Sequence, residues 1–196
     1  MLTPLALLLV FAGILVLFFF LVVVLPVRIL AYAYRKIGVR PRYMFAVLLL
    51  SLLGSVINIP LFSIGSMVVG VNVGGALVPI MLSLYLFAHL RLRGRMLAGT
   101  AIVAVIVHSV AQIVPGAGIA VPMLVPPLAA AGVSLLLSFR QAPPVAYVAG
   151  SMGTLIGADL LNLHRIAEIG APVVSIGGAG TFDGVFLTGI IAGLLV

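Results

Sequence analysis

The sequence contains no cysteine and no tryptophan, and only three of its 196 residues are acidic. Without cysteine the chain can form no disulfide, no thiolate nucleophile and no cysteine-bound metal site. Charged residues make up 7% of the chain and hydrophobic residues 64%, with a mean hydropathy of +1.45. A water-soluble domain of this composition would lack the polar residues that cover a folded surface. The composition therefore predicts a protein that is solvated mostly by lipid.

The motifs of several functional classes are also missing. The sequence has no GxxxxGK phosphate loop and no HExxH zinc motif, and His89, His108 and His164 lack the spacing of metal ligands. We therefore expect no metal site and no cofactor. The net charge of +7 would suit nucleic-acid binding, but the basic residues gather in short loops between apolar runs. We expect no nucleic-acid partner.

Seven apolar runs, each near the roughly 20 residues that a helix needs to cross a bilayer, fill most of the chain. They predict an all-α fold, a polytopic transmembrane helical bundle that forms one domain over residues 1–196. The predicted spans are residues 5–25, 43–62, 71–90, 96–114, 123–139, 145–163 and 181–196. Between them, SIGSMVVG is expected to form a turn, and PGAGIAVP a tight connection or a re-entrant element.

The basic residues predict how the bundle is oriented. The loops after the first, third and fifth spans contain all the basic residues except Arg165: Arg28, Arg35, Lys36, Arg40, Arg42, Arg91, Arg93, Arg95 and Arg140. The positive-inside rule then places the N-terminus outside and the C-terminus in the cytoplasm of a multi-pass cell-membrane protein. Residues 28–42 are expected to form an interfacial amphipathic segment, whose basic residues contact anionic lipid headgroups.

Two of the three acidic residues, Asp159 and Asp183, fall in or beside apolar spans, whereas Glu168 lies in a polar connection. A carboxylate at the middle of a span costs roughly 2.5 to 3.5 kcal/mol, so such a residue is usually paired, protonated or functional. The predicted topology puts Asp159 and Asp183 at similar depth in neighbouring helices. We expect them to form the centre of a polar cluster, with Asn162 on the same helix face as Asp159.

Other polar residues are predicted to lie at this depth and to serve as ligand- or ion-binding groups: Asn58, Asn72, His108 and Gln112. His108 and Gln112 are four residues apart and would share one helix face. Gly-rich breaks precede or contain several of these sites, and broken helices are tolerated in a membrane only beside protein or a water-filled cavity. The alternative is that the polar residues only bond neighbouring helices together.

The segments VNVGGALVPIMLSLYL, GTLIGADLLNL and GGAGTFDGVFLTGIIAGLL together resemble a prokaryotic family of membrane proteins catalogued as domain of unknown function 1614. The resemblance covers most of the chain after the first span. It implies a polytopic membrane protein and no assigned activity.

GGAGTFDGVFLTGIIAGLL also resembles, more weakly, the GxGD helix of intramembrane aspartyl peptidases of the presenilin and signal-peptide-peptidase type. That resemblance implies Asp159 and Asp183 as a catalytic dyad that shares one proton. The aspartate lies three residues beyond GAG, however, and the tyrosine-aspartate pair of those enzymes is missing.

Three functions stay open at this stage. The first is a small accessory or structural subunit, working with membrane-protein partners or as a homo-oligomer. The second is a proton- or cation-coupled transporter or ion-binding protein that uses Asp159 and Asp183. The third is an intramembrane aspartyl peptidase, the one enzyme class that the residues suggest.

Overall fold

The computed structural model of the protein describes residues 4–178 and 184–196. Helices dominate the described chain, as the composition predicted. Three helical stretches are long and apolar enough to cross a membrane, namely Val10–Ile37, Arg93–Val110 and Val125–Ile169, and shorter apolar helices cover Arg42–Gly54, Val73–His89 and Gly184–Leu195. The protein is therefore a mostly helical membrane protein.

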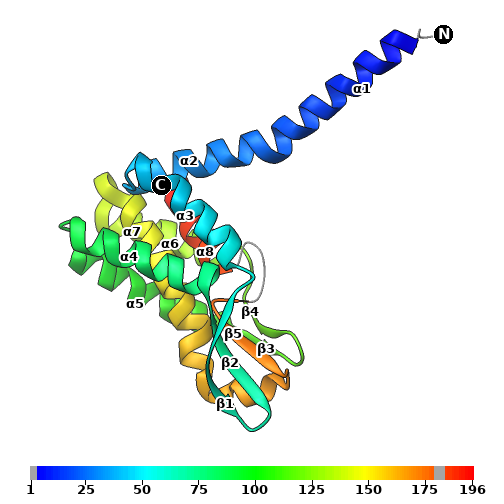
Figure 1. Ribbon diagram of the computed structural model, residues 1–196. Coiled ribbons are helices and arrows are strands. Elements are labelled where there is room, and N and C mark those ends of the chain that lie inside the picture. The colour runs from blue at the N-terminus through cyan, green and yellow to red at the C-terminus, as the bar shows by residue number, and fades with distance from the viewer. Residues whose placement is uncertain (1–3, 179–183) are drawn as a thin grey trace.

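The α-helices, labelled in Figure 1, are α1 (Pro4–Phe19), α2 (Leu25–Ile37), α3 (Pro41–Gly54), α4 (Val78–His89), α5 (Arg93–Val110), α6 (Val125–Ser138), α7 (Ala142–Thr154) and α8 (Gly184–Leu195). Shorter π-helical and 3₁₀ segments are η1 (Phe20–Val24), η2 (Val73–Leu77), η3 (Phe139–Gln141), η4 (Leu155–Asp159) and η5 (Leu160–Ile169). The strands are β1 (Asn58–Ile64), β2 (Met67–Asn72), β3 (Gln112–Val114), β4 (Gly118–Ala120) and β5 (Val173–Ile176).

The first helix is longer than the sequence suggested. α1, η1 and α2 follow one another without a break, and α1 projects away from the other helices (Figure 1). α2 ends where Gly38 adopts the left-handed conformation (φ 101°), a common helix C-cap. Tyr34 and Ile37 are fully buried in the core. The expected interfacial segment 28–42 is thus split between the end of this helix and the start of α3.

From α3 to α8 the helices alternate in direction, and the central helix α7 contacts α2, α4, α5, α6 and α8. Small residues permit this central position. A Cβ atom added to Gly153 would lie 2.7 Å from the Cβ of Val103 on α5, and one added to Gly150 would lie 3.1 Å from the Cγ2 atom of Thr188 on α8. Most residues of α7 are buried, so whatever lies on α7 is held rigidly.

The second and third predicted spans are wrong at the ends that adjoin each other in the sequence. The predicted helix 43–62 ends at Gly54, and the predicted helix 71–90 begins only at residue 73. Between them, β1 and β2 form an antiparallel hairpin with a two-residue Gly65–Ser66 loop, which the positive φ of Gly65 permits. Pro60 sits in the fully exposed strand β1 beside a register shift, a position that tolerates a residue without an N–H.

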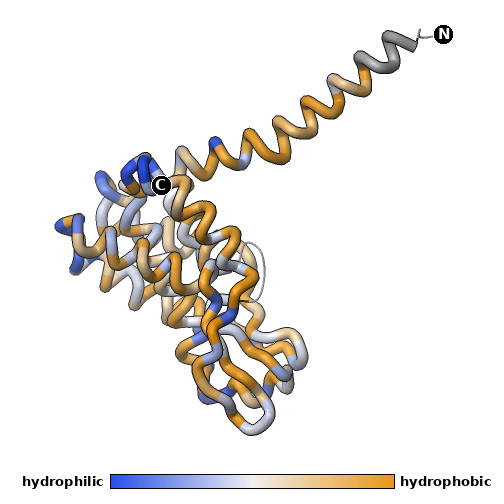
Figure 2. The backbone as a smooth tube through the Cα atoms, in the orientation of Figure 1, coloured by the Kyte–Doolittle hydropathy of each residue, from blue (hydrophilic) through white to orange (hydrophobic). Residues whose placement is uncertain are grey.

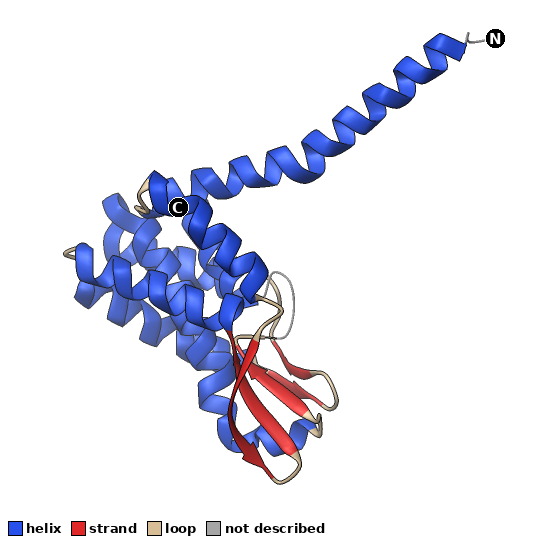
Figure 3. Cartoon of the chain, viewed as in Figure 1, coloured by secondary structure: helices blue, strands red, loops and turns tan. Residues whose placement is uncertain are grey.

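Strands also replace the ends of other predicted helices. Helix α5 ends at Val110, where the prediction continued to 114, and β3 and β4 form a second hairpin in place of the tight connection PGAGIAVP. Strand β5 pairs in parallel with β2, which gives the order β1-β2-β5. Figure 3 shows these strands gathered at one end of the helices. The fold is mostly helical, as predicted, with two small sheets that the sequence analysis missed.

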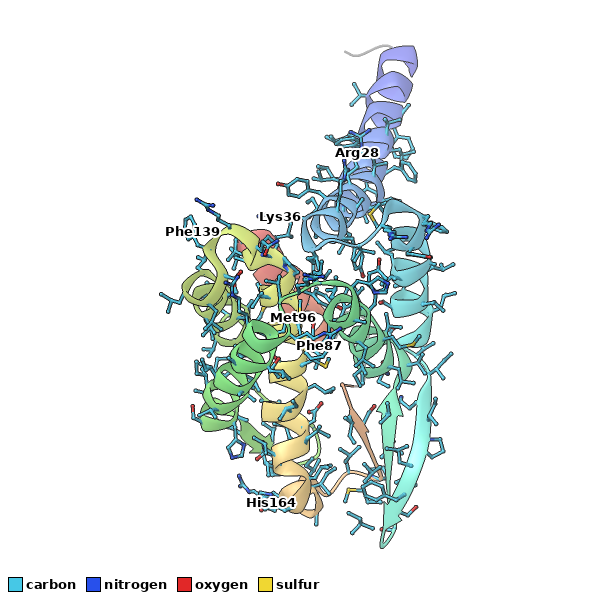
Figure 4. All side chains as sticks on the ribbon, turned by 90° about the vertical axis from the view of Figure 1, so that its left-hand side faces the viewer. Arg28, Lys36, Phe87, Met96, Phe139 and His164 are labelled. Atoms are coloured by element: carbon cyan, nitrogen blue, oxygen red, sulfur yellow. The ribbon has the colours of Figure 1, made fainter. Side chains whose placement is uncertain are left out.

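The opposite end of the helices carries the basic connections. The junctions α2–α3, α4–α5 and α6–α7 form the hydrophilic patches at the upper left of Figure 2. Figure 4 likewise shows Arg28 and Lys36 at one end of the molecule and His164 at the other. Lys36 donates a hydrogen bond of 3.0 Å to the carbonyl of Leu194, which ties the C-terminal helix to this end. The molecule is polarised into a basic end and a sheet end.

Candidate functional site

The candidate site forms where the central helix changes its winding. α7 gives way at Leu155 to a π-helical turn that ends at Asp159, and 3₁₀ winding follows. Such single π-turns occur frequently at functional sites because they redirect a side chain. Gly157 makes room for this turn, since an added Cβ would lie 2.9 Å from the Cβ of Val107 on α5. The altered winding fixes the direction in which the Asp159 carboxyl group points.

The carboxylate of Asp159 accepts a hydrogen bond of 2.7 Å from the backbone N–H of Gly177, which directly follows β5. Gly177 has φ +86°, a conformation that residues with a side chain rarely adopt. A Cβ at Gly177 would also lie 2.8 Å from the backbone nitrogen of Ala76 in η2. Gly177, at the end of β5, therefore contacts both η2 and Asp159 of η4.

Asp159 lines a cavity of about 460 Å³ between α6, α7 and α8. The described walls are mostly apolar, and their hydroxyl groups come from Thr154 and Thr188. The described lining residues are Ile119, Ala120, Val121, Met123, Pro126, Pro127, Thr154, Ala158, Asp159, Gly178, Gly184, Val185, Leu187, Thr188 and Ile191. Thr154, Ala158 and Thr188 are buried, whereas Met123 is 74% exposed. The cavity thus has a buried floor and an open mouth.

Among the residues that the structure describes, Asp159 supplies the carboxylate of this cavity. Within residues 4–178 and 184–196, the recorded ion pair is Arg165 with Glu168, at 3.0 Å and exposed. No described basic side chain lies within ion-pairing distance of Asp159. Its recorded polar contact is the Gly177 N–H, so the carboxyl group keeps capacity to accept a proton or a cation.

Asn58 and Asn72 form a separate cluster that holds the sheet to η2. The fully buried Asn72 donates to the Ser55 carbonyl at 2.7 Å and to Asn58 Oδ1 at 3.1 Å, and it accepts from the Gly75 N–H at 2.7 Å. Ser175 of β5 donates to the same Asn58 oxygen. With these bonds Asn72 caps η2 and joins α3, β1 and β2, which is a structural role.

His108 and Asn162 form another cluster, on the α5 side of the winding change. Asn162 is buried and donates to the carbonyls of Gly157 at 3.1 Å and Ala158 at 2.9 Å. Its amide also lies 3.3 Å from Nδ1 of His108. Asn162 thus satisfies carbonyls that the altered winding frees. Asn162 does not line the cavity of Asp159.

The predicted single cluster is accordingly wrong for the described residues. Gln112 lies exposed on β3, beyond the end of α5, and does not share a helix face with His108. Of the predicted residues that the structure describes, Asp159 is the one that lines the 460 Å³ cavity. Asp183 lies outside the described residues. The sequence analysis missed Gly177, Thr154 and Thr188, although the run GGAG had marked the break that contains the backbone donor.

Comparison with known proteins gives one match. A family model described as "Protein of unknown function (DUF1614)" matches residues 48–195. No curated protein and no solved structure matches the chain.

Proposed function

Since the chain belongs to the DUF1614 family, whose description assigns no activity, we propose its function from the site: a membrane protein that binds a small organic cation at Asp159, in competition with a proton. The observation that carries the proposal is the Asp159 carboxylate, without a basic partner among the described residues, in a large and mostly apolar cavity. This is a specific form of the ion-binding hypothesis.

The size of the cavity favours an organic ligand over a bare ion. About 460 Å³ falls in the range of small-molecule pockets, which hold ligands of several carbon atoms. The apolar walls, among them Val121, Leu187 and Ile191, suit a hydrocarbon body. The carboxylate suits a positively charged or protonated head, because an ionised hydrogen-bond partner adds about 1.5 to 3 kcal/mol.

The same lining disfavours a metal ion. Calcium takes six to eight oxygen ligands, and magnesium near-ideal octahedral geometry. Within the described residues, no group of three or more His, Cys, Asp or Glu side chains could hold a metal. A cationic head needs only one carboxylate and the neighbouring hydroxyl of Thr154 or Thr188, both of which line the cavity.

The membrane arrangement that we propose has seven spans, with the basic end in the cytoplasm. Each of the seven predicted spans contains a helix, although several are shorter than predicted. The gathering of the basic junctions at one end supports this orientation through the positive-inside rule. Arg28, Arg35, Lys36, Arg40 and Arg42 would then meet the anionic headgroups of the cytoplasmic leaflet.

Thermal unfolding of the purified protein with three ligands that share a cyclohexyl ring tests the proposal. We expect cyclohexylammonium to raise the melting temperature more than cyclohexanol, and cyclohexane carboxylate to have no effect, because only the cation pairs with Asp159. Asp159→Asn should remove the advantage of the cation. Glu168→Gln, a change at the exposed acid that pairs with Arg165, is the control and should preserve it.

Equal stabilisation by the cation and the alcohol would contradict the proposal, as would an unchanged preference in Asp159→Asn. The other two hypotheses predict different results. A peptidase would cleave a membrane substrate, and Asp159→Asn would abolish the cleavage. An accessory subunit would be purified with a fixed partner and show no preference among the three compounds.

A further inference from the structure

Several hydroxyl groups in the core have no hydrogen-bond partner in the described structure. They belong to Tyr34 on α2, Ser51 on α3, Ser83 on α4, and Tyr147, Ser151 and Thr154 on α7. Each of these residues is at least nine-tenths buried. Buried hydroxyl groups are almost always bonded to protein or to ordered water. Apart from Ser83, these hydroxyls also follow one another through the bundle.

The α7 hydroxyls lie on one helix face and lead to Asp159. Tyr147, Ser151 and Thr154 are spaced by four and three residues, so they share a face. Continued α-helical winding would turn Asp159 about 140° away from Thr154, since each residue turns about 100°. In a π-turn the hydrogen bond joins residues five apart, so Asp159 comes back toward the side of Thr154. Thr154 and Asp159 accordingly line the same cavity.

The other end of the row reaches a second cavity. Tyr147 and Ser151 both lie against Gly189 of α8, Tyr34 and Tyr147 pack in one core cluster, and Ser51 is a neighbour of Tyr34. Ser51 lines a cavity of about 210 Å³ whose other walls come from η1, α2, α3, η2 and α8. The row Ser51, Tyr34, Tyr147, Ser151, Thr154 therefore begins at one cavity and ends at the other.

We propose that these five hydroxyls, bridged by internal water, form a proton path between the two cavities, by which Asp159 gains and loses the proton that competes with its cation. The path rests on the proposed function, in which Asp159 exchanges the two. Water suits the sites, because each unpartnered hydroxyl offers one donor and two acceptor positions.

Transfer along the path needs no other reactant. Each hydroxyl oxygen or water accepts a proton from one side and releases its own proton to the next oxygen, and rotation of the O–H groups restores the row. At the end of the row the carboxylate of Asp159 takes the proton, so that one O–H bond forms for each that breaks. Gly189 on α8 leaves room for the ring of Tyr147, since an added Cβ would lie 3.0 Å from it.

Proton flux through the full chain reconstituted in phosphatidylcholine vesicles tests the path. The vesicles contain a pH-sensitive dye and receive an imposed pH gradient. We expect the wild-type protein to dissipate the gradient faster than protein-free vesicles. Tyr147→Phe and Ser151→Ala should each slow the flux at least about fivefold, the factor that corresponds to losing one ordinary hydrogen bond.

The matched control is Ser83→Ala, which removes another buried, unpartnered hydroxyl from α4, outside the row, and should leave the flux unchanged. Flux equal to wild type in Tyr147→Phe and Ser151→Ala, or no flux in the wild type, would overturn the path. Cyclohexylammonium binding, measured on the same variants, separates the two proposals. If Tyr147→Phe and Ser151→Ala still bind the cation but show a lower flux, the path is supported. If they show the wild-type flux and only Asp159→Asn loses cation binding, the cation site is retained and the path is overturned.

Discussion

Substitution of Gly177 by alanine probes the junction that holds Asp159. The residue has φ +86°, and a left-handed conformation costs a residue with a side chain about 1 to 2 kcal/mol. The new methyl group would also lie 2.8 Å from the Ala76 nitrogen and 2.9 Å from the carbonyl carbon of Gly75. Overpacking of this kind typically costs about 1 to 3 kcal/mol. We therefore expect Gly177→Ala to destabilise the protein by about 2 to 5 kcal/mol.

Gly170→Ala provides the matched control for this change. Gly170 has φ +66°, and a Cβ there would meet nothing within 4 Å. Only the backbone cost of about 1 to 2 kcal/mol applies to it. Unfolding of both variants in mixed micelles by increasing dodecyl sulfate measures the difference, which should be about 1 to 3 kcal/mol in the same direction. Equal destabilisation of the two variants would refute the close packing of Gly177 against η2.

Three further predictions concern packing and the polar clusters, and the same unfolding assay measures them. Asn72→Ala should destabilise the protein by about 2 to 4 kcal/mol, since it leaves the buried Ser55 carbonyl and Gly75 N–H without their partner; Asn58→Ala, at an exposed position, should cost about 1 kcal/mol or less. Gly189→Ala should destabilise by about 1 to 3 kcal/mol, because its Cβ would collide with the Ser151 hydroxyl. Gly132→Ala should stabilise by about 0.5 to 1 kcal/mol, because Gly132 is an exposed residue within α6 with open space around it. A stabilised Gly189→Ala or a neutral Asn72→Ala would contradict these contacts.

The sequence predicted the helices better than the strands. Long apolar runs with basic loops determine where helices begin at the basic end, because charge and hydropathy are local properties. Residues 58–64 are as apolar as the helices around them, so hydropathy alone extends a helix through them. The Gly65–Ser66 pair between two β-branched runs was the available signal for a hairpin.

The site was predictable only in part, for a similar reason. Asp159 could be identified from the sequence because a carboxyl group in an apolar run is unusual in itself, whichever residues pack against it in the fold. Its direction depends on the π-turn at Leu155, which Gly157 permits by packing against α5, and on the Gly177 N–H far along the chain. Both are tertiary features without a local sequence pattern. Helical spacing likewise misplaced Gln112 on the side of His108, because α5 ends at Val110.

Direct measurement of two dissociation constants tests the central claim that Asp159 gives an apolar cavity its preference for cations. Calorimetric titration of the purified protein with cyclohexylammonium and with cyclohexanol yields the ratio of the two. The expected ratio is about tenfold or more in favour of the cation, from a charge-assisted bond of about 1.5 to 3 kcal/mol, and close to one in Asp159→Asn. A wild-type ratio near one, or a ratio that survives Asp159→Asn, would contradict the account.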